Sequence, residues 1–451
     1  MPRIGSCFAR DPYRVVFEYY DENQPDTVLS KQTVFEDIIN KPTNCLDFTI
    51  GFNKQIELIR SIQDCVLLEK TKLLNKERKE CPECHIKLTK FGSQNSTIHD
   101  VLTDHKVAIP RMRCKTCNHE EPSTVRAIIG GTCSGDLINI QSKLGSEHTY
   151  RESEKILDFF SQKSRQINNH DRVKQVVHAV GSALAVVNEE EKEMIVADKA
   201  SELILNVDGG HLKTVEDKRS IEAMVSVIYK PEALESNDKG TRNYLSSKNC
   251  AASIKDDNQK QIISSTIIAA LKQGLHQDTH VTALCDGAEN CWNVAKALEP
   301  LSGSMTYILD WFHISMKMKN ISLEESLKSK FTRIKWHLWR GNTAAAIVRL
   351  NELIEATNNE SCRTKISNFL TYVENNKHRI VDYRARQKAG LVFTSNLAES
   401  TVESLINQRC KGKQHMRWSR EGLNPVLQLR AAVHSKEWDD KWKTVVLNAL
   451  A

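Results

Sequence analysis

Apolar and polar residues are arranged differently along successive parts of the chain. Near the N-terminus, Val15, Phe17 and Tyr19 alternate with polar residues as in a short strand. From Phe52 to Leu74, apolar residues recur at helical spacing and predict one long helix. We interpret residues 1–79 as a mixed N-terminal region that serves as a scaffold or contact surface, because no candidate chemistry falls within it.

The pattern changes after residue 200. Four short apolar runs predict strands: Leu203–Val207, Ala223–Tyr229, Val281–Cys285 and Met305–Leu309. Lys260–Leu271 has helical spacing, and almost everything from Ser315 onward is helical. Strands that alternate with helices indicate an α/β core. Residues 136–187, ahead of this core, are also predicted to be helical.

Composition narrows the class of protein. The 451 residues are 40% apolar and 27% charged, as in a folded globular protein, and 63 Lys and Arg against 57 Asp and Glu leave a net charge of only +6. No apolar run approaches the roughly 20 residues that cross a bilayer, and no secretory signal is visible. The odd number of cysteines, 13, favours a reducing compartment. We therefore expect a cytoplasmic protein with no membrane association.

Four of the cysteines form two CxxC knuckles. Cys81 and Cys84 make the first, and Cys114 and Cys117 make the second. Each knuckle can present two thiolates to one tetrahedral ion, so residues 80–125 are predicted to form a zinc ribbon that binds Zn²⁺. The alternatives are four ordinary buried cysteines or a redox pair. The nearby His85 and His119 are interpreted as bystanders, since four thiolates already complete the site.

Two amphipathic segments follow within residues 135–187. Tyr150–Phe160 has helical spacing, and Asn169 is a suitable N-cap for a second helix. This arrangement fits a helix-turn-helix-like DNA-binding region with Arg172 and Lys174 near the exposed start of its second helix. An ordinary two-helix hairpin gives a similar pattern.

Acidic residues stand at the ends of two predicted strands. Asp208 follows Leu203–Val207, Asp286 follows Val281–Cys285, and glycine comes directly after each. A carboxylate at the end of a buried strand is costly unless it is paired or binds metal, and glycine lets a ligand approach closely. Asp-Gly is also a common turn, but the pair in one α/β domain favours a site for hard cations such as Mg²⁺.

The C-terminal third carries a longer motif. It runs from Ser395 through Gln408-Arg409 and Met416-Arg417-Trp418 to Arg430. This motif resembles the C-terminal signature of bacterial insertion-sequence transposases of the Kra type, which are relatives of the Mutator-like group. The resemblance also covers Asp208-Gly209, Asp286–Trp292 and Asp310–His313, and it spans about Asp136 to Ala432.

The resemblance implies an RNase H-like catalytic core at residues 200–435, with a helical insertion at about 315–390. It implies a metal-binding triad of Asp208, Asp286 and Glu399 that holds Mg²⁺ or Mn²⁺, with Glu403 and Asp310 as rivals of Glu399. Asp310 and His313 are interpreted as a supporting pair.

Two basic stretches are candidates for DNA contacts. Arg409, Lys411 and Arg417 follow the predicted glutamate, and Trp336 and Trp339 are interleaved with lysines and arginines in the helical insertion. A solvated cationic face is the alternative for the insertion.

Together these features predict a nucleoid-associated DNA transposase. It would bind the terminal inverted repeats of an insertion sequence, cleave and join DNA strands, and act as a homo-oligomer by analogy with such enzymes. The alternatives are an inactive or non-transposing nuclease on the same fold and a zinc-dependent DNA-binding regulator. Thr394-Ser395-Asn396 stands where the family commonly has a Gly-Ser-Gly-like turn, which keeps the first alternative open.

Overall fold

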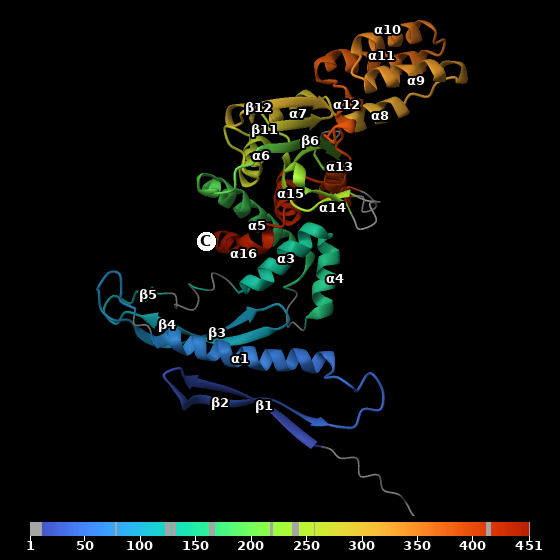
Figure 1. Ribbon diagram of the computed structural model, residues 1–451. Helices are drawn as coiled ribbons and strands as arrows, with labels where there is room; N and C mark the ends of the chain where they lie inside the picture. Colours follow the sequence, from blue (N-terminus) through green and yellow to red (C-terminus); the bar gives the residue numbers. More distant parts are fainter. Residues whose placement is uncertain are drawn as a thin grey trace, which may run out of the picture. The chain divides into compact units, whose positions relative to one another are not determined.

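The computed structural model describes residues 11–76, 79–121, 128, 132–161, 167–216, 220–236, 243–256, 258–411 and 416–450. The chain divides into two compact units (Figure 1). The first comprises Met1–Val176 with Val446–Ala451, and the second comprises Val177–Val445. No helix in the described ranges has both the length and the apolar character to cross a membrane.

The first unit begins with a long antiparallel hairpin, in which β1 (Asp11–Asp21) pairs with β2 (Gln24–Ile39). The predicted strand at Val15–Tyr19 is therefore confirmed, and the predicted helix is α1 (Phe52–Lys76). A three-stranded antiparallel sheet and two further helices follow: β3 (Thr89–His99), β4 (Asp104–Arg113), β5 (Glu120–Glu121), α3 (Gly135–Glu147) and α4 (Tyr150–Phe160). α1 packs against β2 and β4.

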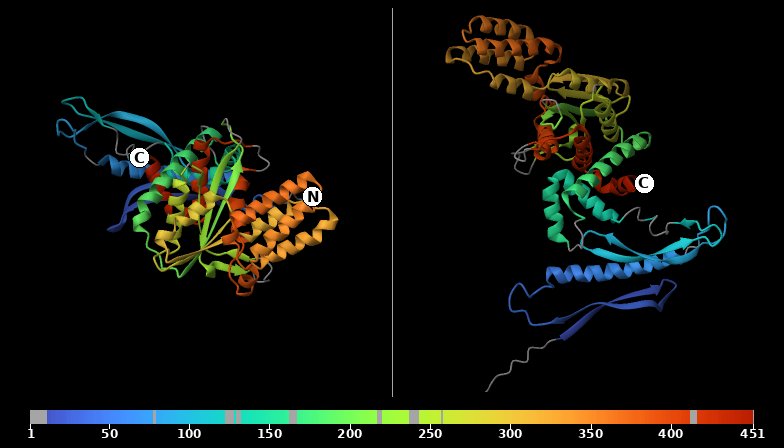
Figure 2. Two further views of the ribbon diagram at one scale, coloured as in Figure 1. Left: turned by 90° about the horizontal axis from the view of Figure 1, so that it is seen from above. Right: turned by 180° about the vertical axis from the view of Figure 1, so that it is seen from behind.

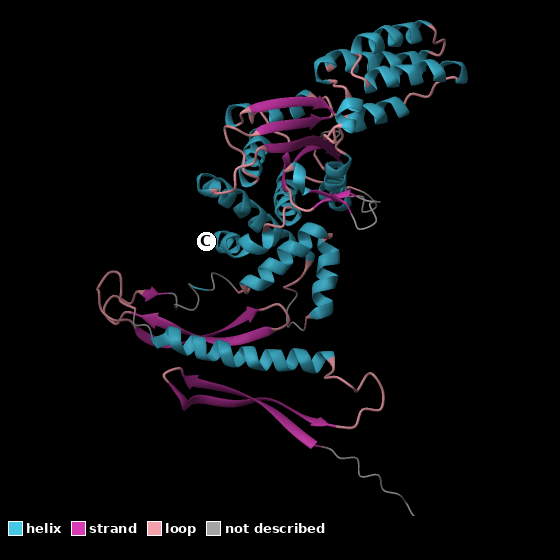
Figure 3. Ribbon diagram, in the orientation of Figure 1, coloured by secondary structure: helices cyan, strands magenta, loops and turns pink. Residues whose placement is uncertain are grey.

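The second unit is built on a five-stranded mixed sheet in the order β10-β7-β6-β11-β12 (Figure 3). Its strands are β6 (Glu202–Leu212), β7 (Ile221–Tyr229), β10 (Asn249–Ile254), β11 (His280–Cys285) and β12 (Ser304–Leu309). β6, β11 and β12 are parallel, whereas β7 is antiparallel to both β6 and β10. The α/β core that alternating strands and helices predicted is confirmed at this level.

α6 and α15 pack on this sheet, and α8–α12 form a group that follows β12 and extends away from it (gold and orange in Figure 2). The helices are α5 (His170–Glu191), α6 (Lys260–Lys272), α7 (Glu289–Lys296), α8 (Trp311–Lys319), α9 (Glu325–Trp339), α10 (Thr343–Glu355), α11 (Glu360–Asn375), α12 (Tyr383–Lys388), α13 (Asn396–Val402), α14 (Gln408–Cys410), α15 (Arg420–His434) and α16 (Trp438–Leu450). The short elements are the 3-10 turns Lys192–Met194, Pro231–Ala233, Glu299–Leu301 and Lys377–Arg379, the π-turn Glu403–Asn407, and the small hairpin of β8 (Leu234–Ser236) and β9 (Asn243–Leu245).

Two details differ from the sequence analysis. Asp208 does not close its strand, because β6 continues through Leu212 as the partner of β7. β10 was not expected, since its small residues give no strong apolar signal, yet all six of its residues are buried. β10 is covered by α6 and α15. Burial between two layers therefore forms this strand where local propensity does not.

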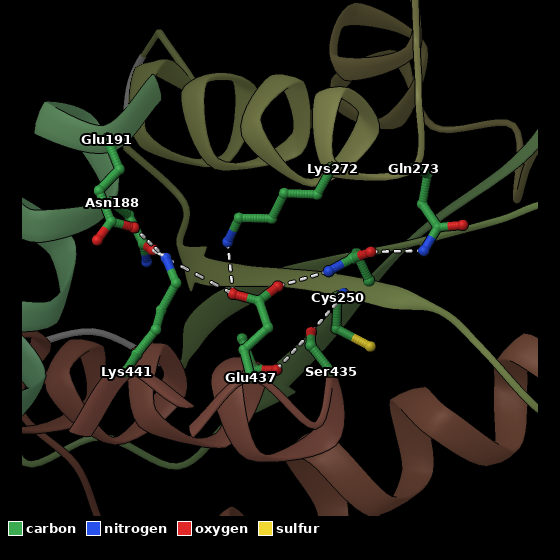
Figure 4. Close-up of polar contacts among 10 residues, drawn as sticks. Asn188, Glu191, Cys250, Lys272, Gln273, Ser435, Glu437 and Lys441 are labelled. Atoms are coloured by element: carbon green, nitrogen blue, oxygen red, sulfur yellow. Dashed lines mark hydrogen bonds and ion pairs between the residues drawn. The ribbon is translucent and has the colours of Figure 1, made fainter. Parts of the chain in front are cut away.

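A polar cluster ties α16 to the rest of the second unit (Figure 4). Glu437 accepts hydrogen bonds from Lys272 Nζ on α6 and from Asn249 Nδ2 on β10, each at 2.5 Å. Lys441 Nζ donates to Glu191 Oε2 of α5 at 2.5 Å. The side chains of Glu437 and Lys272 are only 19% and 17% exposed, so each charge is stabilised by the other in place of water. Burial lowers the pKa of Lys272, and the neighbouring Glu437 carboxylate opposes that shift.

Candidate functional site

The four knuckle cysteines of the first unit converge on one point. The sulfur atoms of Cys81, Cys84, Cys114 and Cys117 all lie within 4.8 Å of one another, and Cys81 Sγ is 3.5 Å from Cys117 Sγ. Cys81 and Cys114 are fully buried, whereas the other two are half-buried. Four sulfurs so placed fit a tetrahedral Zn²⁺ with bonds of about 2.3 Å. The predicted cysteine cluster is confirmed as a group that could hold zinc.

The two knuckles have the same backbone turn. The N–H of His85 donates to Cys81 O at 2.9 Å, and the N–H of Asn118 donates to Cys114 O at 3.1 Å. His85 and Asn118 both have a positive φ, 54° and 62° respectively. Each knuckle is therefore closed by the same backbone hydrogen bond to a residue with positive φ.

Backbone N–H groups of the second knuckle point at a sulfur. Those of Cys117 and Thr116 lower the pKa of the Cys114 thiol to about 6. A thiol that ionises near neutral pH is ready to bind a metal ion. His119 instead directs its Nε2 to Glu121 Oε1 at 2.8 Å, as expected of a residue outside the cluster.

The start of α5 carries the residues predicted to contact DNA. Asn169 caps the helix, since its Oδ1 accepts from the N–H of Arg172 at 2.8 Å. Lys174 is exposed, but Arg172 is half-buried and its Nη2 points to Cys133 Sγ at 3.8 Å. Asn168, which directly precedes this cap residue, is buried. The exposed side chain of Lys174 is therefore free to contact DNA, whereas that of Arg172 is partly buried against Cys133.

Three aspartates form a row across the parallel strands of the second unit. The residues directly before them are paired in register, from β6 to β11 and from β11 to β12. Asp208, Asp286 and Asp310 therefore follow at one level of the sheet, and the N–H of Asp310 donates to Cys285 O at 3.0 Å. We call Asp208, Asp286 and Asp310 the aspartate row. The row places two predicted metal ligands and one predicted supporting residue on neighbouring strands.

Asp208 lies in the most charged part of this row. Burial raises the pKa of its carboxyl, and the nearby charges of Asp286 and Asp310 act in the same direction. The charge of His313 and a hydrogen bond of 2.8 Å from the N–H of Gly209 oppose that shift. His313 Nε2 is 3.9 Å from Asp208 Oδ1. Burial and the two neighbouring carboxylates therefore both disfavour a negative charge on Asp208.

Asp310 is enclosed by hydrogen bonds and is only 1% exposed. It caps α8 through the N–H of Phe312 at 3.1 Å and bonds His313 Nδ1 at 2.8 Å. Ser395 gives it two more contacts, from its N–H to Oδ1 at 3.0 Å and from its Oγ to Oδ2 at 2.5 Å. Burial alone would lower the pKa of His313, but the hydrogen bond and charge of Asp310, with the charges of Asp208 and Asp286, raise it to about 9. The oxygens of Asp310 are occupied, which fits a supporting role better than metal binding.

Asp286 is held by the turn that follows it. Its Oδ1 accepts from the N–H of Ala288 at 2.8 Å, and its carbonyl accepts from the hydroxyl of Tyr372 at 2.8 Å. Gly287, between Asp286 and Ala288, has φ +100°. A Cβ atom at this position would lie only 2.7 Å from Tyr372 Cε2, which is too close for any other residue. Tyr372 comes from α11 and Ser395 from the turn before α13. No local pattern in the sequence marks either residue, because their partners lie 85 or more positions away.

The comparisons with known proteins identify a family. Residues 145–444 match the model of the uncharacterised protein family UPF0236, which covers more than half of the 451-residue chain. The chain belongs to this family. No curated protein matches it. The matched range of this UPF0236 member includes the aspartate row and α13, but it begins after the cysteine cluster.

The third carboxylate expected in this UPF0236 member lies on α13. Glu399 falls within the helix Asn396–Val402, and its side chain lies outside the described part of the structure. Ser395 directly precedes this helix, so its two hydrogen bonds to Asp310 fix where α13 begins. The rival Glu403 is exposed and accepts a hydrogen bond from Asn407. The backbone therefore starts α13 beside the aspartate row, and Glu399 as a ligand stays a prediction.

The basic residues after α13 are placed unequally. Arg409 is 1% exposed, and its guanidinium lies 5.2 Å from the centroid of the Trp418 ring. This burial contradicts its expected contact with DNA phosphates, and we assign it to the packing of the second unit instead. Lys411, in contrast, lies near β6. Its Nζ is 3.5 Å from the position that a Cβ atom would take at Gly210, two residues after Asp208. Arg417 is exposed.

Proposed function

We propose that this UPF0236 member is a DNA transposase with an RNase H-like core. The observation that carries the proposal is the aspartate row, in which Asp208 and Asp286 directly follow Val207 and Cys285, a register pair of adjacent parallel strands. Ligand sites of α/β sheets commonly form outside the carboxyl ends of such strands. The mixed sheet and the helices α8–α12 between β12 and α13 support the expected core with a helical insertion.

Asp208, Asp286 and Glu399 are the proposed ligands of Mg²⁺ or Mn²⁺. Carboxylate oxygens are the ligands these ions prefer, and burial raises the pKa of Asp208, so a cation would stabilise its charged form. Two such ions activate an attacking oxygen and stabilise a leaving one in phosphoryl transfer. Asp310 orients His313 beside Asp208 and holds the start of α13 through Ser395. These contacts would keep the three ligands in place.

DNA recognition is assigned to the residues ahead of the core. The cysteine cluster would hold Zn²⁺ in a ribbon, and α4 with α5 would form the helix-turn-helix-like region with Lys174 exposed. Lys411 lies close to β6 and Arg417 is exposed, so both are proposed to contact phosphates near the aspartate row. Terminal inverted repeats and target DNA are the proposed partners, and a homo-oligomer would bring two ends together.

A strand-transfer assay tests this proposal. The DNA carries the inverted repeats that flank the gene, and product is measured with Mg²⁺ or Mn²⁺ for wild type and Asp286→Asn. The asparagine keeps the acceptor that bonds the N–H of Ala288, so the turn should survive. We expect activity to fall by at least about a hundredfold, with DNA binding retained.

The matched pair Glu399→Gln and Glu403→Gln then identifies the third ligand. We expect the first to abolish transfer and the second to leave it within about twofold, because Glu403 is exposed and bonded within its own π-turn. Full activity of Asp286→Asn would disprove the metal mechanism. Retained DNA binding without any strand transfer in wild type would favour the DNA-binding regulator or an inactive family member.

A further inference from the structure

A hollow of about 670 Å³ lies among three helices of the second unit. Its lining comes from α9, the turn after it, α10 and α12. The lining residues are Arg333, Trp336, His337, Trp339, Arg340, Arg349, Arg384, Gln387 and Lys388. No carboxylate is among these described residues, so five cationic side chains surround one concave surface.

Most of these cations have no counter-ion among the residues that the structure describes. Arg349 Nη1 pairs with Glu352 Oε2 at 2.8 Å. The side chains of the other four, Arg333, Arg340, Arg384 and Lys388, form no ion pair or hydrogen bond with the described part of the chain, and all four are exposed. Like charges gathered without acidic partners repel one another, and an anion with several negative groups relieves that repulsion.

Trp336 stands among these cations with a largely free face. It is 52% exposed and stacks on no aromatic ring of the described residues. Trp339, three residues later, behaves differently, since its ring stacks on Tyr383 at 5.9 Å and meets Trp311 at 4.7 Å. Of these two tryptophans of α9, only Trp339 packs against other aromatic rings of the described residues. A large exposed aromatic side chain within a cationic hollow suits a flat aromatic partner.

The packed aromatic side chains hold the hollow in a fixed form. Tyr383 begins α12 and stacks on Trp339 of α9, which joins two walls of the hollow. The hydroxyl of Tyr383 donates to Leu309 O at 2.6 Å, the residue just before Asp310. The hollow is therefore anchored at the end of β12, on the element that completes the aspartate row.

We propose that this hollow binds single-stranded DNA, with phosphates on the unpaired cations and one unpaired base stacked on Trp336. A duplex offers the phosphates but keeps its bases paired and stacked on one another, so it cannot use the free face of Trp336. The choice of DNA rests on the proposed function, because strand cleavage and transfer expose unpaired ends.

Binding of a labelled 12-nucleotide oligothymidylate to the full chain tests the inference. Fluorescence anisotropy gives Kd at several salt concentrations, with no divalent ion added. We expect Arg333→Ala with Arg384→Ala to weaken binding about tenfold or more and to reduce the salt slope by about 1.4, since two phosphate contacts are lost. The matched control, Lys330→Ala with Lys365→Ala, removes equal charge from exposed positions outside the hollow and should change Kd less than twofold.

Trp336→Ala isolates the stacking contact. It should weaken oligothymidylate binding about tenfold without changing the salt slope, and Trp336→Phe should restore most of the affinity. A 12-base-pair duplex should bind Trp336→Ala and wild type equally. Unchanged oligothymidylate affinity in Trp336→Ala, or an equal loss for the duplex, would overturn the inference.

Asp286→Asn serves as the background that separates this inference from the proposed function. It should bind oligothymidylate like wild type, because the hollow does not include the aspartate row. If strand transfer fails but oligothymidylate binding still depends on the residues of the hollow, the proposed function is contradicted and the inference is retained. If strand transfer is active but the substitutions at Arg333, Arg384 and Trp336 leave the Kd for oligothymidylate unchanged, the inference is wrong.

Discussion

The two glycines that follow Asp208 and Asp286 have different roles. In the sequence both follow an aspartate at a strand end, where glycine can allow a turn or the close approach of a ligand. Gly209 continues β6 and does not have a positive φ, and a Cβ there would come no closer than 3.3 Å, to the flexible Glu222 Oε1. Gly287 has φ +100° and no room beside Tyr372. Only the second glycine is required by the backbone.

Alanine at each position should separate these roles. Gly287→Ala should lower the free energy of unfolding by at least about 2 kcal/mol, because the positive φ and the clash with Tyr372 add together. Gly209→Ala should change it by less than about 1 kcal/mol, since an extended backbone accepts alanine. Urea unfolding followed by circular dichroism measures both. Equal losses in the two variants would contradict this assignment.

Several elements could be predicted from the sequence and others could not. The strands β6, β7 and β11 contain runs of apolar residues that are buried on both faces, which makes the pattern visible. The edge strand β12 is buried only at its end, but its apolar run also marks it in the sequence. β10 consists largely of small residues and forms because α6 and α15 cover it. β2 is mostly polar and exposed, so it is defined only by its pairing with β1.

The same distinction applies to the site. Asp208 and Asp286 were found because each follows an apolar run directly. Ser395 and Tyr372 were missed, since their contacts to Asp310 and Asp286 depend on where distant helices pack. Arg409 was misassigned because charge alone does not show that a guanidinium is buried against Trp418.

Glu437, directly before α16, joins the start of that helix to α6 and β10. Glu437→Ala would leave Lys272 and Asn249 without their partner in a region that is largely buried. We expect the free energy of unfolding to fall by about 2 kcal/mol. Glu352→Ala, which removes an exposed pair with Arg349, should cost less than about 0.5 kcal/mol. If urea titrations gave the same small loss of unfolding free energy for Glu437→Ala and Glu352→Ala, the contacts of Glu437 would contribute little to stability.

At the scale of the whole chain, we expect the two units to depend on different sources of stability. The second has a continuous apolar core around its five-stranded sheet. Around the knuckle cysteines of the first unit, the buried cluster consists of Cys81, Cys114 and Leu88. Met112 and the thiols of Cys84 and Cys117 pack beside it. So small a core cannot hold the turns together, and a metal ion bound by the cysteines would supply most of the stability there.

Removal of zinc should therefore act on one unit only. Wild type should contain about one Zn²⁺ per chain by elemental analysis, and Cys114→Ser should contain almost none. Because separate units need not unfold in one transition, calorimetry should resolve two, and the variant should lose the one that belongs to the first unit. Cys45→Ser, an exposed cysteine of the same unit outside the cluster, is the matched control and should keep both the zinc and the two transitions. If Cys114→Ser shifted both transitions equally, the units would be stabilised together, and if it retained its zinc, the cysteine cluster would not be the metal site.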